Sequence, residues 1–229
     1  MFFLSSHSKV VSALPAGITS HDVIDRLRRL TGIKRIGHAG TLDPLATGLL
    51  IVAVSREATR DLNQLVKMDK TYEAVFYLGQ ETDTYDAEGK ITKTYEGPVI
   101  SEGELAQALT FFVGQQQQIP SMYSAKKVGG KKLYQLARQD KIIERQPNTI
   151  TISNLEILNY HWPELSLRIT CSSGTYIRSL AFDLGRALGC GAHMSALRRT
   201  TIGDYNITKA VKLESLTADN WTHYLFQLN

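Results

Sequence analysis

Asp43 stands in a segment whose residue types could fix one carboxylate for nucleophilic attack. Residues 37–50 read GHAGTLDPLATGLL, with a single acidic side chain among three glycines. Pro44 biases Asp43 towards an extended backbone, and Gly40 and Gly48 permit close approach of backbone or ligand. A carboxylate held rigidly at the rim of a sheet can act as a nucleophile, although an Asp-Pro pair taken alone is commonly an ordinary turn.

A second segment, residues 171–180, combines an aromatic and a cationic side chain where a strand turns into a helix. It reads CSSGTYIRSL and turns at Gly174. Tyr176 and Arg178 are therefore expected in the first helical turn, a position suited to contacting an anion or a ligand. Taken alone, Arg178 is more simply a helix-surface charge and Tyr176 a core aromatic.

Tyr72 and His38 are two further candidate side chains. Tyr72, at the entry to a strand, offers a flat face for stacking and a phenol for proton transfer. Both residues have plainer explanations, since a tyrosine here suits an ordinary edge strand and a lone loop histidine is usually just exposed.

Together these segments resemble the TruB family of pseudouridine synthases, over about residues 15–207. The match to residues 37–50 is long and gap-free, and the family's Gly-Thr-Tyr-Ile-Arg motif stands at 174–178. The resemblance implies roles for six side chains. Asp43 would be the catalytic nucleophile and Arg178 its ionic partner. Tyr176 would lie against the target base, and Tyr72 would be the active-site tyrosine. Leu197 would make an apolar contact to the uridine, and His38 would lie near the flipped nucleotide.

The resemblance also implies an activity and a partner. The chain is expected to be an isomerase that flips the T-loop uridine of tRNA, position 55 in tRNA numbering, and converts it to pseudouridine. Asp43 would attack either the base or the anomeric carbon of the ribose, and both sites stay open. The expected partner is the T-arm stem-loop of tRNA, recognised by shape more than by a linear code. No obligatory protein partner and no membrane are expected.

Signals for other chemistry are weak. No phosphate-cradling glycine loop ends in Lys-Ser or Lys-Thr, and no histidine pair has helical metal-binding spacing. Neither a metal nor an organic cofactor is expected.

Basic residues modestly outnumber acidic ones. The 229 residues include 26 Lys and Arg against 22 Asp and Glu, a net charge of +4. Adjacent basic pairs favour a surface that tracks phosphates. These pairs stand at 28–29, 34–35, 126–127, 131–132 and 198–199. The resemblance assigns phosphate contacts to Arg198 or Arg199.

Cysteine usage and the N-terminus indicate a cytoplasmic protein. Cys171 and Cys190 have neither metal-like spacing nor a disulfide framework, so a buried thiol in a reducing compartment is expected. The apolar residues 1–4 lack a preceding cationic region, and no window reaches the apolar length of a membrane span.

The elements that must position these side chains indicate an α+β protein. Many strands are not separated by single crossover helices, which favours a mixed, mostly antiparallel central sheet flanked by helices. The resemblance implies that this is the pseudouridine synthase catalytic fold with a protruding thumb loop. Strands are expected at 49–54, 72–78 and 165–171, and a helix at 177–188.

Three serines are predicted to cap helices. Ser20 would cap a helix that Gly32 ends, and Ser55 would cap one that continues to Val66. Ser101 and Glu104 form a capping-box pattern before a further helix.

We expect a single catalytic domain over residues 1–229, with an RNA-contacting insertion at about 115–148. The insertion resembles the RNA-gripping thumb of the family, although its composition also suits a floppy connector. Members of the family often carry a C-terminal RNA-binding domain, and residues 209–229 are too few for one, so none is evident.

Two other functions remain open. One is a catalytically silent tRNA-binding or folding factor, because Leu14 stands where the family has a lysine. The other is a synthase that acts on a different RNA.

Overall fold

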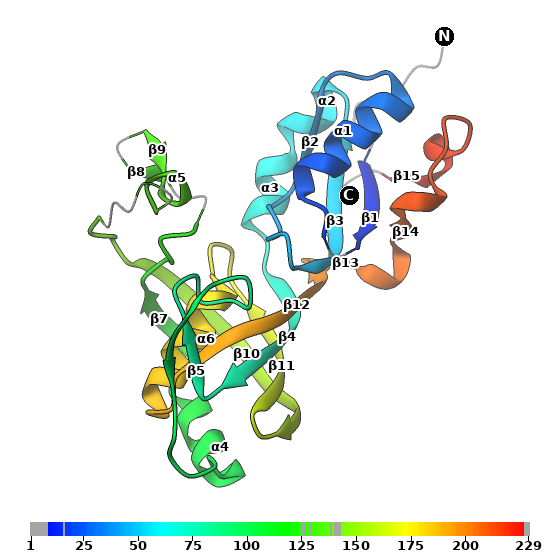
Figure 1. The fold of residues 1–229 in the computed structure, drawn as a ribbon. Helices are drawn as coiled ribbons and strands as arrows, with labels where there is room; N and C mark the ends of the chain where they lie inside the picture. Colours follow the sequence, from blue (N-terminus) through cyan, green and yellow to red (C-terminus); the bar gives the residue numbers. More distant parts are fainter. Residues whose placement is uncertain are drawn as a thin grey trace. The chain divides into compact units, whose positions relative to one another are not determined.

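The computed structural model describes most of the chain, in two compact units. The described residues are 9–15, 17–124, 127–128, 130–137, 139 and 143–226. The first unit comprises residues 1–72 and 197–229, and the second comprises residues 73–196 (Figure 1). Two strands, β4 (Lys70–Leu78) and β12 (Ala192–Ile202), contribute residues to both units.

The sheet of the first unit is built around β3 (Thr47–Val54). Its strand order is β14 (Val211–Lys212), β1 (Lys9–Leu14), β3 and β12; β2 (Ile36–His38) also pairs with β3, β15 (Leu225–Phe226) with β1, and β13 (Tyr205–Asn206) with β12. Residues 48–54 of β3 are all buried, which confirms the predicted strand covered on both faces. The order places β3, which follows the Asp43 segment, next to β12.

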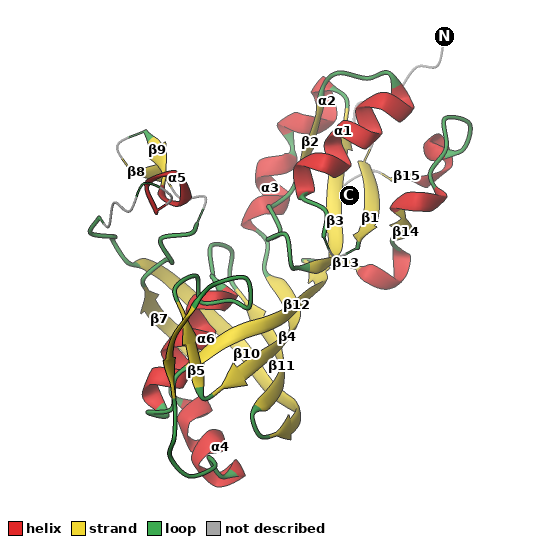
Figure 2. Cartoon of the chain, viewed as in Figure 1, coloured by secondary structure: helices red, strands yellow, loops and turns green. Residues whose placement is uncertain are grey.

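The described part of the first unit contains three α-helices, and one of its predicted caps is wrong. Figure 2 shows them beside the strands of this unit. Helix α1 (Ser20–Thr31) is capped by Thr19, whose hydroxyl accepts a hydrogen bond from the Asp22 N–H while the Asp22 carboxylate accepts one from Thr19. Ser20 lies one residue inside the helix, and its hydroxyl accepts a hydrogen bond from the N–H of Leu42 at 3.0 Å.

The predicted cap at Ser55 is confirmed, since its hydroxyl accepts a backbone N–H of α2 (Arg56–Arg60). The helix does not continue as expected. It ends at Arg60, and α3 (Leu62–Lys67) follows Asp61 as a separate helix. Val66, expected inward, is 39% exposed. The unit ends in short 3-10 helices: η1 (Ile207–Lys209), η2 (Leu213–Ser215) and η3 (Trp221–Tyr224).

The second unit contains the antiparallel strands of the prediction. Its strand order is β12, β4, β11 (Glu164–Cys171), β10 (Asn148–His161) and β7 (Gly114–Gln118), with β5 (Gln80–Thr82) and β6 (Ile91–Thr94) forming a separate pair. The β11/β10 and β10/β7 pairs are antiparallel, and β4 and β11 bury alternate residues. The mixed, mostly antiparallel α+β fold is therefore confirmed.

The helices of the second unit are α4 (Glu102–Thr110) and α6 (Ile177–Ala187), with the small α5 (Leu133–Ala137). The capping box of Ser101 and Glu104 is confirmed.

The segment predicted as an insertion begins inside β7, because residues 115–118 pair with β10. It continues through the short hairpin of β8 (Lys127–Val128) and β9 (Lys131–Lys132) to α5. Lys126 and Arg138 lie outside the described residues, as do residues 1–8. In the part of the chain that is described, no helix is both long and apolar enough to cross a membrane.

Candidate active site

Asp43 lies in the loop between β2 and β3, and hydrogen bonds hold the loop backbone before and after this residue. The Asp43 carbonyl accepts the N–H of Ala46 at 2.9 Å, which closes a tight turn. The carbonyl of Pro44 accepts the N–H of Gly17 at 3.2 Å. Ser20 holds the residue before Asp43, as described above. Asp43 itself is half-buried. These contacts fix the backbone that carries the Asp43 side chain.

Arg199 anchors both flanks of this loop. Its side chain is 1% exposed. The guanidinium donates from Nε to the carbonyl of Leu49 at 2.8 Å and from Nη2 to the carbonyl of Gly40 at 3.1 Å. It also hydrogen-bonds the side chain of Tyr72. Of the two arginines considered for phosphate contacts, Arg199 is therefore buried with internal partners, whereas its neighbour Arg198 is exposed.

His38 lies at the end of β2, directly before the loop, and is half-buried. Burial is the main cause that lowers the pKa of His38, and the nearby positive charge of Arg199 lowers it further. The imidazole is therefore mainly neutral at pH 7, since an unperturbed histidine has a pKa of about 6.5. A neutral ring can stack without carrying a charge into the site.

Leu197 and Tyr72 lie on the strands beside the loop. The carbonyl of Leu197 accepts a hydrogen bond from the Thr47 hydroxyl at 3.4 Å, where β12 joins β3. Leu197 and Tyr72 are each 7% exposed. The first unit thus connects Asp43, His38, Tyr72 and Leu197 through one loop and its neighbouring strands.

Tyr176 and Arg178 lie in the second unit, at the start of α6. The side-chain amide of Gln118 binds the backbone of Tyr176 twice. Its Oε1 accepts the Tyr176 N–H at 2.8 Å, and its Nε2 donates to the Tyr176 carbonyl at 3.0 Å. Gln118 is 2% exposed. The last residue of β7 therefore fixes the first turn of α6.

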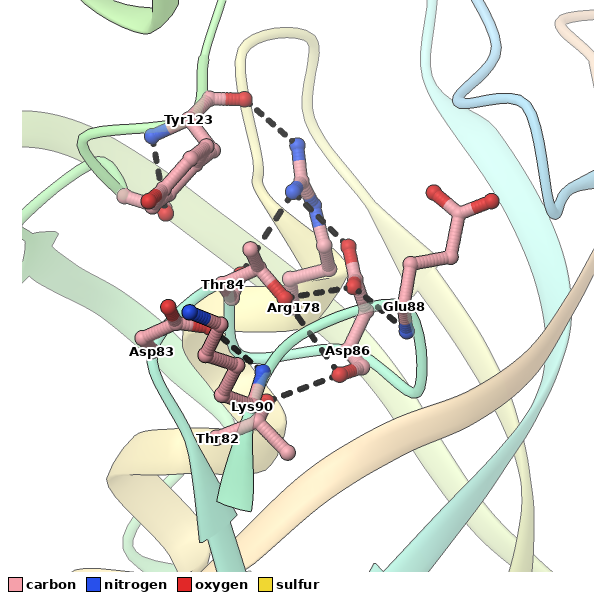
Figure 3. A network of polar contacts seen from close by, with 9 residues as sticks. Thr82, Asp83, Thr84, Asp86, Glu88, Lys90, Tyr123 and Arg178 are labelled. Atoms are coloured by element: carbon pink, nitrogen blue, oxygen red, sulfur yellow. Dashed lines mark hydrogen bonds and ion pairs between the residues drawn. The ribbon is translucent and has the colours of Figure 1, made fainter. Parts of the chain in front are cut away.

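Arg178 is buried in a polar network (Figure 3). Its Nη1 lies 2.9 Å from Oδ2 of Asp86, and its Nη2 donates to the carbonyl of Tyr123 at 2.9 Å. A longer contact of 3.4 Å joins Nη1 to the carbonyl of Thr84. Arg178 is thus a buried guanidinium with fixed partners, and the helix-surface alternative is wrong.

The acidic run before β6 holds Asp86 in place. Oδ1 of Asp86 accepts the Thr84 hydroxyl at 2.6 Å and the Glu88 N–H at 3.1 Å (Figure 3). Hydrogen bonds within the segment itself therefore hold this turn. Sequence reasoning missed that Asp86 also pairs with Arg178, 92 residues further along the chain. It likewise missed Gln118 and the burial of Arg199, because no local pattern signals such partners.

Within the described residues, no group of three His, Cys, Asp or Glu side chains could hold a metal ion. Cys171 and Cys190 are both buried.

Two family models match consecutive parts of the chain. The model described as TruB family pseudouridylate synthase (N terminal domain) matches residues 28–177, about two thirds of the chain. This chain belongs to the TruB family of pseudouridylate synthases. The model described as tRNA pseudouridylate synthase B C-terminal domain matches residues 178–227 of this TruB family member. Arg178 opens the second match, and Asp43 lies within the first.

Relatives within the TruB family are similar over most of the chain. A tRNA pseudouridine synthase B of Opitutus terrae is 45% identical over 204 residues, which cover 89% of this chain and 84% of the relative. A tRNA pseudouridine synthase B of Protochlamydia amoebophila is 49% identical over 191 residues, which cover 83% of this chain and 72% of the relative.

Chains in two solved complexes are similar in structure to this TruB family chain. One is an H/ACA RNP bound to a substrate RNA containing 2′-deoxyuridine, with a TM-score of 0.72, 25% identity, and coverage of 97% of this chain. Another is a Cbf5-Nop10-Gar1 complex, with a TM-score of 0.72, 27% identity, and coverage of 94% of this chain. This chain spans 59% and 55% of those two solved chains.

Proposed function

We propose that this chain converts the T-loop uridine of tRNA, position 55, to pseudouridine, with Asp43 as the nucleophile. Membership of the TruB family and the names of the relatives support the reaction and the substrate class. The observation that carries the assignment to Asp43 is the loop, whose backbone is hydrogen-bonded before and after this residue. A rigid support is what a nucleophile needs to meet one atom of a bound substrate.

The reaction is an isomerisation that needs no external reagent. The enzyme extrudes the uracil from its stack, at a cost of a few kcal/mol that pocket contacts offset. Asp43 attacks the base or the anomeric carbon of the ribose. The bond between N1 and C1′ breaks, the base rotates, and a bond forms between C5 and C1′. The proton on C5 leaves and N1 gains one, so atoms and charge balance. No metal, organic cofactor or protein partner enters the proposal.

The other side chains named by the resemblance also have roles in this proposal. Arg178 keeps Asp43 ionised when the nucleotide excludes water, because a guanidinium is always charged. Tyr176 packs against the target base and Leu197 makes an apolar contact to the uridine. Tyr72 takes part in the proton transfer. Family resemblance supports these roles.

His38 stacks near the flipped nucleotide in the same proposal, and its lowered pKa suits an uncharged ring. The chain acts as one catalytic domain over residues 1–229, whose insertion at about 115–148 grips the RNA. The exposed Arg198 contacts phosphate. The protein works in the cytoplasm, where a tRNA substrate is available to it.

One assay tests the proposal against its alternatives. A T-arm stem-loop and an unrelated stem-loop are incubated with the protein, and pseudouridine is detected as a chemical adduct that stops reverse transcription. Product at position 55 of the T-arm alone supports the proposal. Binding without product would identify a silent tRNA-binding factor, and product in the unrelated RNA would identify a synthase with another target.

A further inference from the structure

We propose that Arg199 is a positioning residue for the isomerisation, because its buried guanidinium joins both flanks of the Asp43 loop to Tyr72. The inference rests on the proposed function. Arg199 touches neither substrate nor reacting atoms in this account. It acts through the residues that it holds.

The burial of Arg199 indicates a specific role for its side chain. Arg199 is the largest of the side chains with less than 2% exposure. Burial lowers the pKa of its guanidinium, and the electrostatic interaction and hydrogen bond with Tyr72 partly offset this effect. Moving a cation out of water is costly unless hydrogen bonds satisfy its donors. A residue that only filled space in this position could be apolar.

The two carbonyls that Arg199 holds define the ends of the catalytic loop. Nη2 bonds Gly40, three residues before Asp43, and Nε bonds Leu49, six residues after it. Both donors belong to one planar, rigid group, so they fix the spacing between the two carbonyls. The span that carries Asp43 is therefore closed by a single side chain.

Two glycines of the loop, Gly40 and Gly48, lie close to Arg199. Gly40 has φ +89°, and a Cβ built on it would lie 3.4 Å from Nη1 of Arg199. Gly48 has φ +106°, and its Cβ would lie 2.3 Å from the carbonyl oxygen of Arg199. Left-handed backbone at both positions suits glycine, and the contacts explain why the loop lies so close to β12.

Tyr72 connects Arg199 to the proposed proton transfer. The same guanidinium that holds the loop hydrogen-bonds this tyrosine, which is 7% exposed. The proposed function gives Tyr72 a proton-transfer role and Asp43 the nucleophilic role. Arg199 therefore sets the position of Tyr72 relative to the loop of Asp43. A change in the guanidinium should disturb both groups together.

The substitution Arg199→Lys tests this inference, because it keeps the charge and removes the planar fork. The matched control is Arg56→Lys, at an exposed arginine of the same unit. Single-turnover pseudouridine formation, affinity for the T-arm stem-loop and Tm are measured for both variants. We expect Arg199→Lys to slow the single-turnover rate by about tenfold to a hundredfold, since small misplacements of catalytic groups cost that much. Affinity should stay within about threefold, and Arg56→Lys should match the wild type.

A second substitution keeps the inference testable if Arg199→Lys fails to fold. Gly40→Ala leaves the guanidinium intact but strains the backbone at φ +89°, so it should slow the rate by displacing the loop segment that Arg199 holds. In a cycle with Tyr72→Phe, the effect of Arg199→Lys, or of Gly40→Ala in its place, should be smaller than in the wild-type background.

The outcomes separate the two proposals. An active wild type with Arg199→Lys and Gly40→Ala both within twofold of its rate would overturn the positioning role alone. Equal losses of rate and affinity would assign Arg199 to RNA binding. A wild type that forms no pseudouridine would remove the proposed function, and the positioning role with it.

Discussion

Arg178 and Asp86 form a buried ion pair, with 2.9 Å between Nη1 and Oδ2, although 92 residues separate them in the chain. The side chains are 8% and 4% exposed. The pair ties the start of α6 to the turn before β6. Because both charges are buried, the position of each depends on the other.

Asp86→Asn should lower the free energy of unfolding by about 3–5 kcal/mol, because it breaks a buried ion pair. Urea denaturation measures the change. The control is Glu88→Gln, which removes an exposed carboxylate from the same turn and should leave the unfolding free energy nearly unchanged. Equal effects of the two substitutions would show that the Arg178 pair contributes nothing specific.

Asp43→Asn should abolish pseudouridine formation while affinity for tRNA stays within a few-fold. The amide is close in size to the carboxylate but is a poor nucleophile, so chemistry is lost and binding is retained. Product is measured by adduct formation and reverse transcription, and affinity by filter binding. Normal product formation by this variant would remove Asp43 from the nucleophilic role.

Arg178→Ala should lower turnover much more than affinity, since the proposed role of Arg178 is to keep the nucleophile ionised. Turnover and affinity for the T-arm are measured well below the Tm of the variant, because loss of the ion pair also lowers stability. Matching losses in turnover and affinity would instead indicate a simple phosphate contact.

The stability of the protein should fall as the pH drops through the range in which unfolded histidine titrates. The pKa of His38 is lowered from 6.5, first by burial and then by the charge of Arg199. The unfolded chain therefore binds more protons than the folded chain between the folded pKa and slightly above 6.5. The contribution of His38 is fully present above that range and is lost as the pH falls towards the folded pKa.

Urea denaturation at roughly pH 7.5 and about pH 5.5 measures this effect. His38→Gln should reduce the difference in unfolding free energy between the two conditions, whereas His223→Gln, at an exposed histidine, should retain it. An unchanged pH dependence in His38→Gln would contradict the prediction.

Local patterns in the sequence predicted the elements that carry the site. The run 49–54 is a buried strand, the alternation at 165–171 is a strand, and Ser101 with Glu104 caps a helix, as expected. Each of these depends on periodicity or on partners within a few residues, which a sequence displays directly. The motif around Asp43 belongs to the same class, because its glycines and its proline act on the adjacent backbone.

Helix ends were predicted less well from the sequence alone. Ser20 and Thr19 are both acceptable caps, but Thr19 forms the capping box with Asp22, and the Ser20 hydroxyl instead accepts the N–H of Leu42. Asp61 divides a helix that periodicity had continued to Val66. Such choices depend on contacts made after the chain has folded.

The sequence by itself determined the family, the strands at 49–54, 72–78 and 165–171, and the capping box of Ser101 and Glu104. Only the tertiary structure decided that Arg199 is buried beneath the loop and that Arg178 pairs with Asp86. Arg199 bonds a carbonyl 159 residues away, and Arg178 a carboxylate 92 residues away. A charged residue has the same appearance in a sequence whether it faces water or a buried partner, because its environment is set by distant segments that meet only on folding.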